Sequence, residues 1–193
     1  SFPFFPDGGS AAPRQGLSEL GREAIAEMNR LGIIVDVSHM ASTAIEETLA
    51  ATEKPVIATH ASSRTLADHA VSLYAEHVQE IARRGGIIGV ILYPHELSNY
   101  ASRVSSLERG SLRDVVRTVR HITKICGTHE AVAIGSDYGA VTSGPAEIPS
   151  LDRIGVLAAH LMDEFGDESV VEAIMAGNAV DFLRTNWRSG ALT

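Results

Sequence analysis

Helix-like and strand-like patterns alternate along this 193-residue chain, and this alternation restricts its fold more than any other feature. Four short apolar runs read as buried strands, over residues 33–39, 55–60, 86–93 and 131–137. Helical patterns separate and follow them, over about 17–31, 42–52, 75–84, from 111 onward, 151–165 and 168–186. Right-handed crossovers between such strands predict a parallel α/β architecture, and both an open doubly wound sheet and a (β/α)8 barrel fit it.

Residues suited to helix ends stand at the predicted boundaries. Ser18, Ser111, Ser150 and Asp167 are placed as N-caps, because their side-chain oxygens can accept a free amide of the first turn. Gly32 is placed where the first helix should end, since glycine adopts the left-handed conformation common there. These positions support the helical segments inferred from periodicity.

Charge and composition exclude several classes of function. The net charge is −8 with both signs interspersed, which argues against nucleic-acid binding. No apolar run approaches the ~20 residues of a membrane span, and no glycine-rich phosphate fingerprint follows a strand. The single cysteine, Cys126, excludes a disulfide framework and is interpreted as a small buried hydrophobe, with a reactive thiol as the alternative.

Polar residues with catalytic chemistry follow three of the four predicted strands. His39, His60 and Asp137 each end a strand, and the remaining strand leads into Tyr93 and His95. The carboxyl ends of parallel strands form the functional rim of α/β folds, and neighbouring strands lie ~4.8 Å apart, so two imidazoles can reach one ion. A hydrogen-bonded structural role for either histidine, and a turn-capping role for Asp137, are the alternatives. The other histidines are interpreted as surface residues: His69, His77, His95, His121, His129 and His160.

Seven segments, taken together and in order, resemble membrane (renal-type) dipeptidases, peptidase family M19, and their bacterial relatives. The similarity runs from about Gly16 to Trp187, nearly the whole chain. The segments are 16–21 (GLSELG), 29–32 (NRLG), 36–39 (DVSH), 59–64 (THASSR), 85–90 (GGIIGV), 134–138 (IGSDY) and 177–178 (GN).

The resemblance implies a parallel TIM-like (β/α)8 barrel, to which this chain contributes about the last four βα units. It also implies a two-zinc site that hydrolyses dipeptides. In such enzymes the histidines matching His39 and His60 bind one zinc, and the acid matching Asp137 handles protons on the attacking water or departing amine. Two metals would activate a bridging water and polarise the scissile carbonyl.

The chain departs from the family pattern in three places. The early strands, with their His-x-Asp pair, a bridging Glu and a substrate-contacting His, are absent, so the ligands of a second zinc are not in this chain. Val71 and Ser72 stand where relatives have an Arg-Asn pair, whose Arg clamps the substrate carboxylate. Gly139 stands where relatives have a second acid, and no substrate-binding residue is assigned.

These observations lead to a set of expectations. Residues 1–16 form a connecting loop, and 17–193 form the C-terminal half of a metallo-dipeptidase barrel that needs the missing half or another chain, with a homo-oligomer as one alternative. The expected activity is zinc-dependent hydrolysis of a small dipeptide-like substrate. A non-catalytic or half-barrel relative that binds a ligand or a partner, and a metal-dependent amidohydrolase with a non-dipeptide substrate, remain open. With neither a signal-peptide pattern nor a membrane span in the given sequence, a cytoplasmic location is favoured.

Overall fold

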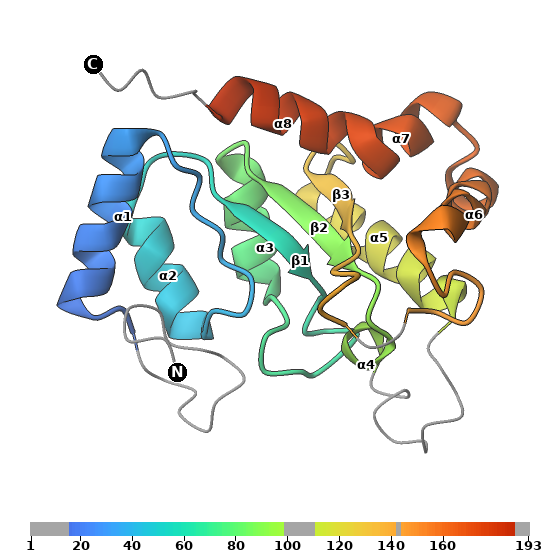
Figure 1. Cartoon of the computed structure of the whole chain (residues 1–193), viewed down its shortest axis with the longest axis horizontal. Coiled ribbons are helices and arrows are strands. Elements are labelled where there is room, and N and C mark those ends of the chain that lie inside the picture. Colours follow the sequence, from blue (N-terminus) through green and yellow to red (C-terminus); the bar gives the residue numbers. More distant parts are fainter. Residues whose placement is uncertain (1–15, 99–110, 142–143, 188–193) are drawn as a thin grey trace.

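A parallel sheet of three short strands lies at the centre of the computed structural model, which describes residues 16–98, 111–141 and 144–187 (Figure 1). The strands are β1 (Ile57–Ala61), β2 (Ile87–Ile91) and β3 (Val132–Gly135), hydrogen-bonded in that order. The register pairs Ile57 with Ile87 and Ile88 with Val132. The three carboxyl ends therefore meet at one edge, where a site can be assembled.

The segment predicted as the first strand is not a strand. It forms a single parallel bridge, between Asp36 and Ile57, although the amides of Val37 and Ile57 donate to carbonyls across it at 2.8 and 3.0 Å. Just beyond it the Met40 amide donates back to the Val37 carbonyl, and this turn ends the pairing with β1. The four-strand prediction was thus wrong by one strand: the segment runs beside β1 but turns away after a single bridge.

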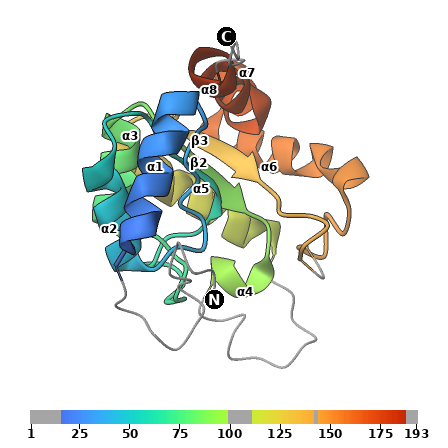
Figure 2. The ribbon, with the colours of Figure 1, turned by 60° about the vertical axis from the view of Figure 1, so that its left-hand side comes forward.

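Helices cover both faces of the sheet. On one side lie α3 (Ala75–Arg83) and α5 (Leu112–Cys126), and on the other α8 (Asn178–Asn186) crosses the strands (Figures 1 and 2). The remaining elements are α1 (Glu19–Leu31), α2 (Ser42–Ala51), α4 (Pro94–Leu97), η1 (Leu151–Arg153), α6 (Gly155–Phe165), α7 (Glu168–Glu172) and the π-helical η2 (Ala173–Gly177). The predicted helix over 168–186 is thus interrupted by a π-helical segment, and α4 had not been predicted. No helix in the described part of the chain has the length and apolar character to cross a bilayer.

Most of the predicted helix ends match the structure. The Ser18 hydroxyl accepts the Gly21 amide, and Asp167 accepts the amides of Ser169 and Val170. Gly32 ends α1 with a φ of 75°. Ser150 makes no such cap, and its hydroxyl donates to Asp152 instead.

Strand periodicity divides the apolar residues between two clusters. Ile88, Val90 and Val132 belong to the main core, which includes the buried faces of α3 and α5. Ile87 and Ala133, one residue out of phase, pack with Phe182 of α8 in a smaller cluster. Because alternate side chains of a strand point to opposite faces, each face of the sheet is covered by its own set of helices.

Two glycines let the strands curl tightly around the carboxyl end of β1. A methyl group on Gly135 would lie 1.8 Å from the Thr59 carbonyl oxygen, and one on Gly89 would lie 2.1 Å from the same atom. No side chain fits such spaces, so glycine is required at both positions. This close approach fixes β3 against the residue that precedes His60.

His77 is buried, which corrects its interpretation as a surface residue. It lies on α3 with 4% of its surface exposed, and its Nε2 is 3.5 Å from Ser42 Oγ and 3.6 Å from Glu46 Oε1, both on α2. The ring is therefore part of the α2–α3 packing. Cys126 is half-buried against the core, and burial raises the pKa of its thiol to about 11, in keeping with an unreactive packing residue.

Candidate metal and catalytic site

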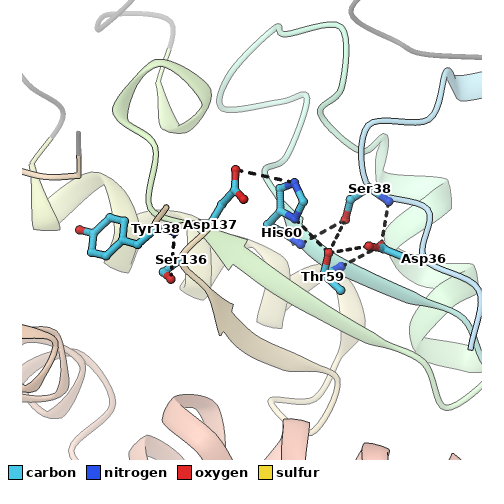
Figure 3. Close-up of polar contacts among 7 residues, drawn as sticks. All are labelled: Asp36, Ser38, Thr59, His60, Ser136, Asp137 and Tyr138. Carbon is cyan, nitrogen blue, oxygen red and sulfur yellow. Dashed lines mark hydrogen bonds and ion pairs between the residues drawn. The ribbon is translucent and has the colours of Figure 1, made fainter. Parts of the chain in front are cut away.

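The structure brings together the three residues that were predicted at strand ends, although the segment before His39 forms a bridge and no strand. The candidate ligand atoms of His39, His60 and Asp137 all lie within 4.8 Å of one another. The His39 and His60 rings have their centroids 4.8 Å apart, and His60 Nε2 lies 3.9 Å from Asp137 Oδ2. Figure 3 shows the His60 ring and the Asp137 carboxylate pointing toward each other above the ends of β1 and β3. His95 and Val71 are not in this cluster: His95 is exposed on α4, and Val71 is buried.

Backbone conformation singles out two members of the cluster. Among the described residues, His39 (φ 61°) and Asp137 (φ 54°) are the two non-glycine residues with positive φ. Positive φ is uncommon for non-glycine residues, although aspartate and histidine adopt it more often than most, and such conformations tend to persist where the surroundings over-determine them. The strain thus lies at the positions that aim the two side chains into the cluster.

A hydrogen-bond network behind His60 fixes its ring. His60 Nδ1 lies 2.9 Å from Thr59 Oγ1, and the Thr59 hydroxyl donates to Asp36 Oδ2 at 2.6 Å. Asp36 Oδ1 accepts the amides of Ser38 and Thr59 at 3.0 and 3.1 Å. The Ser38 hydroxyl accepts the His60 amide at 3.1 Å and lies 3.2 Å from Thr59 Oγ1 (Figure 3). Asp36 and Thr59 were not identified as site residues from the sequence, although both fall inside the quoted motifs.

The turn after β3 holds Asp137 in place. The Asp137 carbonyl accepts the amides of Ala140 and Val141 at 3.1 and 3.0 Å. Tyr138 anchors this turn, because its hydroxyl donates to the Ile148 carbonyl and its amide donates to Ser136 Oγ at 3.3 Å. Burial raises the pKa of the Tyr138 hydroxyl, so the phenol stays protonated as a donor.

The donor set suits a zinc ion. Two imidazoles and one carboxylate are ligand types found in catalytic zinc sites. His60 and Asp137 each keep about a fifth of their side-chain surface exposed, 18% and 21%, so the cluster is open to solvent. The residues present therefore fit a metal ion with room for water or substrate beside it.

Comparisons with known proteins find relatives that match most of the chain. The model of the membrane dipeptidase family, peptidase family M19, matches residues 6–188. An uncharacterised dipeptidase of Schizosaccharomyces pombe is 29% identical over 169 residues, 87% of this chain and 39% of that protein. Dipeptidase 3 of Mus musculus is 28% identical over 170 residues, 88% of this chain and 33% of that protein.

Solved structures show the same fold. A metallopeptidase of Rhodobacter sphaeroides, liganded with a phosphinate mimic of L-Ala-D-Ala, superimposes with a TM-score of 0.83 at 24% identity. The match covers 96% of this chain and 50% of that structure. This chain thus spans between a third and a half of the length of these proteins.

Proposed function

Because the chain belongs to the membrane dipeptidase family, peptidase family M19, we propose that it carries part of the active site of a zinc-dependent dipeptidase. The family match confirms the resemblance inferred from the seven ordered segments. The observation that carries the proposal is the convergence of His39, His60 and Asp137, whose ligand atoms lie within 4.8 Å of one another. Relatives named as dipeptidases support dipeptides as the substrate class.

In this proposal His39 and His60 hold a zinc ion and Asp137 moves the proton. The ion would supply Lewis acidity, lowering the pKa of a nearby water toward about 7 and polarising the scissile carbonyl. Asp137, 3.9 Å from His60, is placed to take a proton from the attacking water and pass it to the departing amine. Thr59 and Ser38 hold His60, and the turn after β3 aims Asp137.

We infer that residues 17–193 form the C-terminal half of a (β/α)8 barrel, whose other half supplies the ligands of a second zinc. The matched relatives are two to three times as long as the matched segment, which supports this inference. Large apolar side chains are exposed, among them Ile33 at 49% and Trp187 at 67%. A completing half or a second copy would cover such surface, so light scattering should detect an assembly larger than one isolated chain.

The test is metal analysis with a dipeptide panel on the assembled enzyme. We expect about two zinc equivalents per complete barrel, and loss of dipeptide hydrolysis on chelation that zinc restores. A protein that binds no zinc, or that keeps full activity in chelator, would contradict the proposal. Zinc binding without hydrolysis of any dipeptide would favour the alternative function, that of a non-catalytic relative that binds a ligand without cleaving it.

One observation favours a narrower alternative for the substrate. Val71, at the place of the carboxylate-clamping Arg, is 7% exposed and cannot form a bidentate ion pair with a substrate carboxylate. An amidohydrolase acting on substrates that lack this carboxylate would need no such clamp. Equal or faster cleavage of C-terminally amidated dipeptides than of free dipeptides would support the alternative, and cleavage confined to free dipeptides would exclude it.

A further inference from the structure

We propose that Asp36, acting through the Thr59 hydroxyl, is a positioning residue that holds His60 as the Nδ1–H tautomer and so leaves the Nε2 lone pair free for a ligand. The inference rests on the proposed function for the identity of that ligand, a zinc ion. The tautomer itself follows from the direction of three hydrogen bonds around Thr59. Nothing in the chemistry of an isolated imidazole fixes that choice, because either ring nitrogen can carry the proton.

The direction of the first hydrogen bond is set by Asp36. A carboxylate has no proton to give, so the 2.6 Å contact between Thr59 Oγ1 and Asp36 Oδ2 requires the threonine to donate. The other carboxylate oxygen, Oδ1, is occupied by the amides of Ser38 and Thr59. These two amides fix the orientation of the Asp36 side chain, so that Oδ2 faces the threonine.

The direction of the second hydrogen bond follows from the first. A threonine hydroxyl has one proton, and once it is given to Asp36, Oγ1 can only accept. The 2.9 Å contact with His60 Nδ1 then requires the proton to be on Nδ1. Nε2, on the far side of the ring, is left unprotonated and lies 3.9 Å from Asp137 Oδ2, inside the candidate metal cluster.

Ser38 completes the network without conflict. Its hydroxyl accepts the His60 amide at 3.1 Å, and its own proton can point to the second lone pair of Thr59 Oγ1, 3.2 Å away. Every donor in the group then has an acceptor. The opposite His60 tautomer would place two unprotonated atoms, Nδ1 and Oγ1, against each other at 2.9 Å and would turn an N–H toward the metal position.

Asp36→Asn is the informative variant, because it should reverse the direction of the hydrogen bonds that link residue 36, Thr59 and His60. The amide oxygen of the new side chain is expected to remain where Oδ1 accepts two backbone amides, which turns the NH2 group toward Thr59. Thr59 would then accept from the asparagine and donate to His60 Nδ1, and the ring proton would move to Nε2. Mutation of the hydrogen-bond partner of a metal-binding histidine typically lowers metal affinity by about 10- to 100-fold, and we expect a loss of zinc affinity in that range.

The experiment reads the tautomer and zinc binding separately. Long-range 1H–15N correlation spectra of selectively labelled, metal-free protein at about pH 8, where ordinary imidazoles are neutral, identify the unprotonated nitrogen of His60. The signals of His60 are identified as those that disappear in the His60→Gln variant. In the wild type, Nε2 of His60 should be unprotonated, and in Asp36→Asn, Nδ1 should be unprotonated. In Thr59→Val, His60 should show no preference for either tautomer. Thr59→Ser keeps the hydroxyl and should keep the wild-type pattern, and the charge-matched control Asp163→Asn, at an exposed position of α6, should change nothing.

Competition titrations with zinc alone complete the test. Asp36→Asn and Thr59→Val should bind zinc about 10- to 100-fold more weakly than the wild type, and Thr59→Ser within a few-fold of it. A wild-type His60 protonated on Nε2, or an Asp36→Asn variant with an unchanged tautomer, would overturn the inference. If the tautomers behave as stated but the wild type binds no zinc, the metal function fails while the positioning role of Asp36 is upheld.

Discussion

At the scale of single residues, the site is built from side chains held in unusual or strictly oriented positions. His39 projects from a backbone with φ 61°, whereas His60 lies in β1, where the pairing with β2 is irregular between Ala58 and Ala61. The orientation of the His60 ring depends on Thr59 and Asp36. Within the described part of the chain, the His39 ring makes no hydrogen bond of its own. The two proposed ligands are therefore positioned by different means, backbone conformation for one and side-chain contacts for the other.

The backbone strain at His39 predicts an unusual order of stability. Glycine occupies positive φ without penalty, so His39→Gly should have a free energy of unfolding about 1 kcal/mol higher than His39→Ala, although both lack the imidazole. At the exposed helical position His160 the order should invert, since glycine costs about 1 kcal/mol relative to alanine inside a helix. Urea denaturation of the four variants measures both differences. If His39→Gly is no more stable than His39→Ala, the positive φ of His39 carries no strain.

Asp137→Asn separates a proton-transfer role from a ligand role. If Asp137 moves protons, the variant should keep zinc affinity within a few-fold and lose about 10²- to 10⁴-fold in kcat on a dipeptide, because the amide cannot accept the proton. If Asp137 instead ligates the ion, zinc affinity should fall as strongly as in His60→Ala. Parallel zinc titration and steady-state kinetics on the assembled enzyme distinguish the two roles.

At the scale of elements, the site depends on how closely β3 approaches β1. Gly135→Ala would place a methyl group 1.8 Å from the Thr59 carbonyl oxygen, and one of the two strands must shift. We expect a loss of about 1–3 kcal/mol in the free energy of unfolding, together with weaker zinc binding, because Thr59 lies at this contact and Asp137 follows Gly135 by two residues. Gly155→Ala, where a methyl group meets no atom within 4 Å, is the matched control and should be neutral or slightly stabilising. Equal stability of the two variants would contradict the close approach.

Packing between α2 and α3 predicts a pH-dependent stability through His77. Burial lowers the pKa of this histidine, and the carboxylates of Glu46 and Glu76 only partly oppose that effect. The unfolded chain therefore binds the proton first as the pH falls, and folding stability is lost below about pH 6.5. Between about pH 7.5 and 5.5 the free energy of unfolding of His77→Leu should fall less than that of the wild type, as measured by urea denaturation. His160→Leu, at an exposed position, should keep the wild-type slope; identical slopes for all three proteins would exclude His77 as the cause.

The elements that could be predicted from sequence are those whose signals are local. Amphipathic periodicity and the caps at Ser18, Gly32 and Asp167 located helices correctly, because each signal lies within a few residues of its effect. The segment over 33–39 has the composition of a strand, yet strand formation also needs continued pairing that composition does not encode. The burial of His77 and the contact of Gly135 with Thr59 likewise depend on which distant segments meet.

At the scale of the whole molecule, the order of motifs was more informative than any one of them. Predicted strand-end positions indicated that His39, His60 and Asp137 would lie near one another, since carboxyl ends of parallel strands share an edge. The structure brings the three together although the segment before His39 makes only one bridge to β1. The roles of Asp36 and Thr59 could not be derived in this way, because they depend on the directions of hydrogen bonds between segments more than twenty residues apart. The chain as described holds three strands, and the complete barrel remains part of the proposal.

We propose that His39 and His60 bind the same zinc ion, and a zinc titration of the assembled, metal-free enzyme is the most direct test. Wild type, His39→Ala, His60→Ala and the double variant should be compared by competition with a chelator of known affinity. Each single variant should weaken the same binding event, and the double variant should lose little more zinc affinity than either single variant, because both ligands serve one ion. Unchanged zinc binding in both single variants, or strictly additive losses from two separate sites, would contradict it.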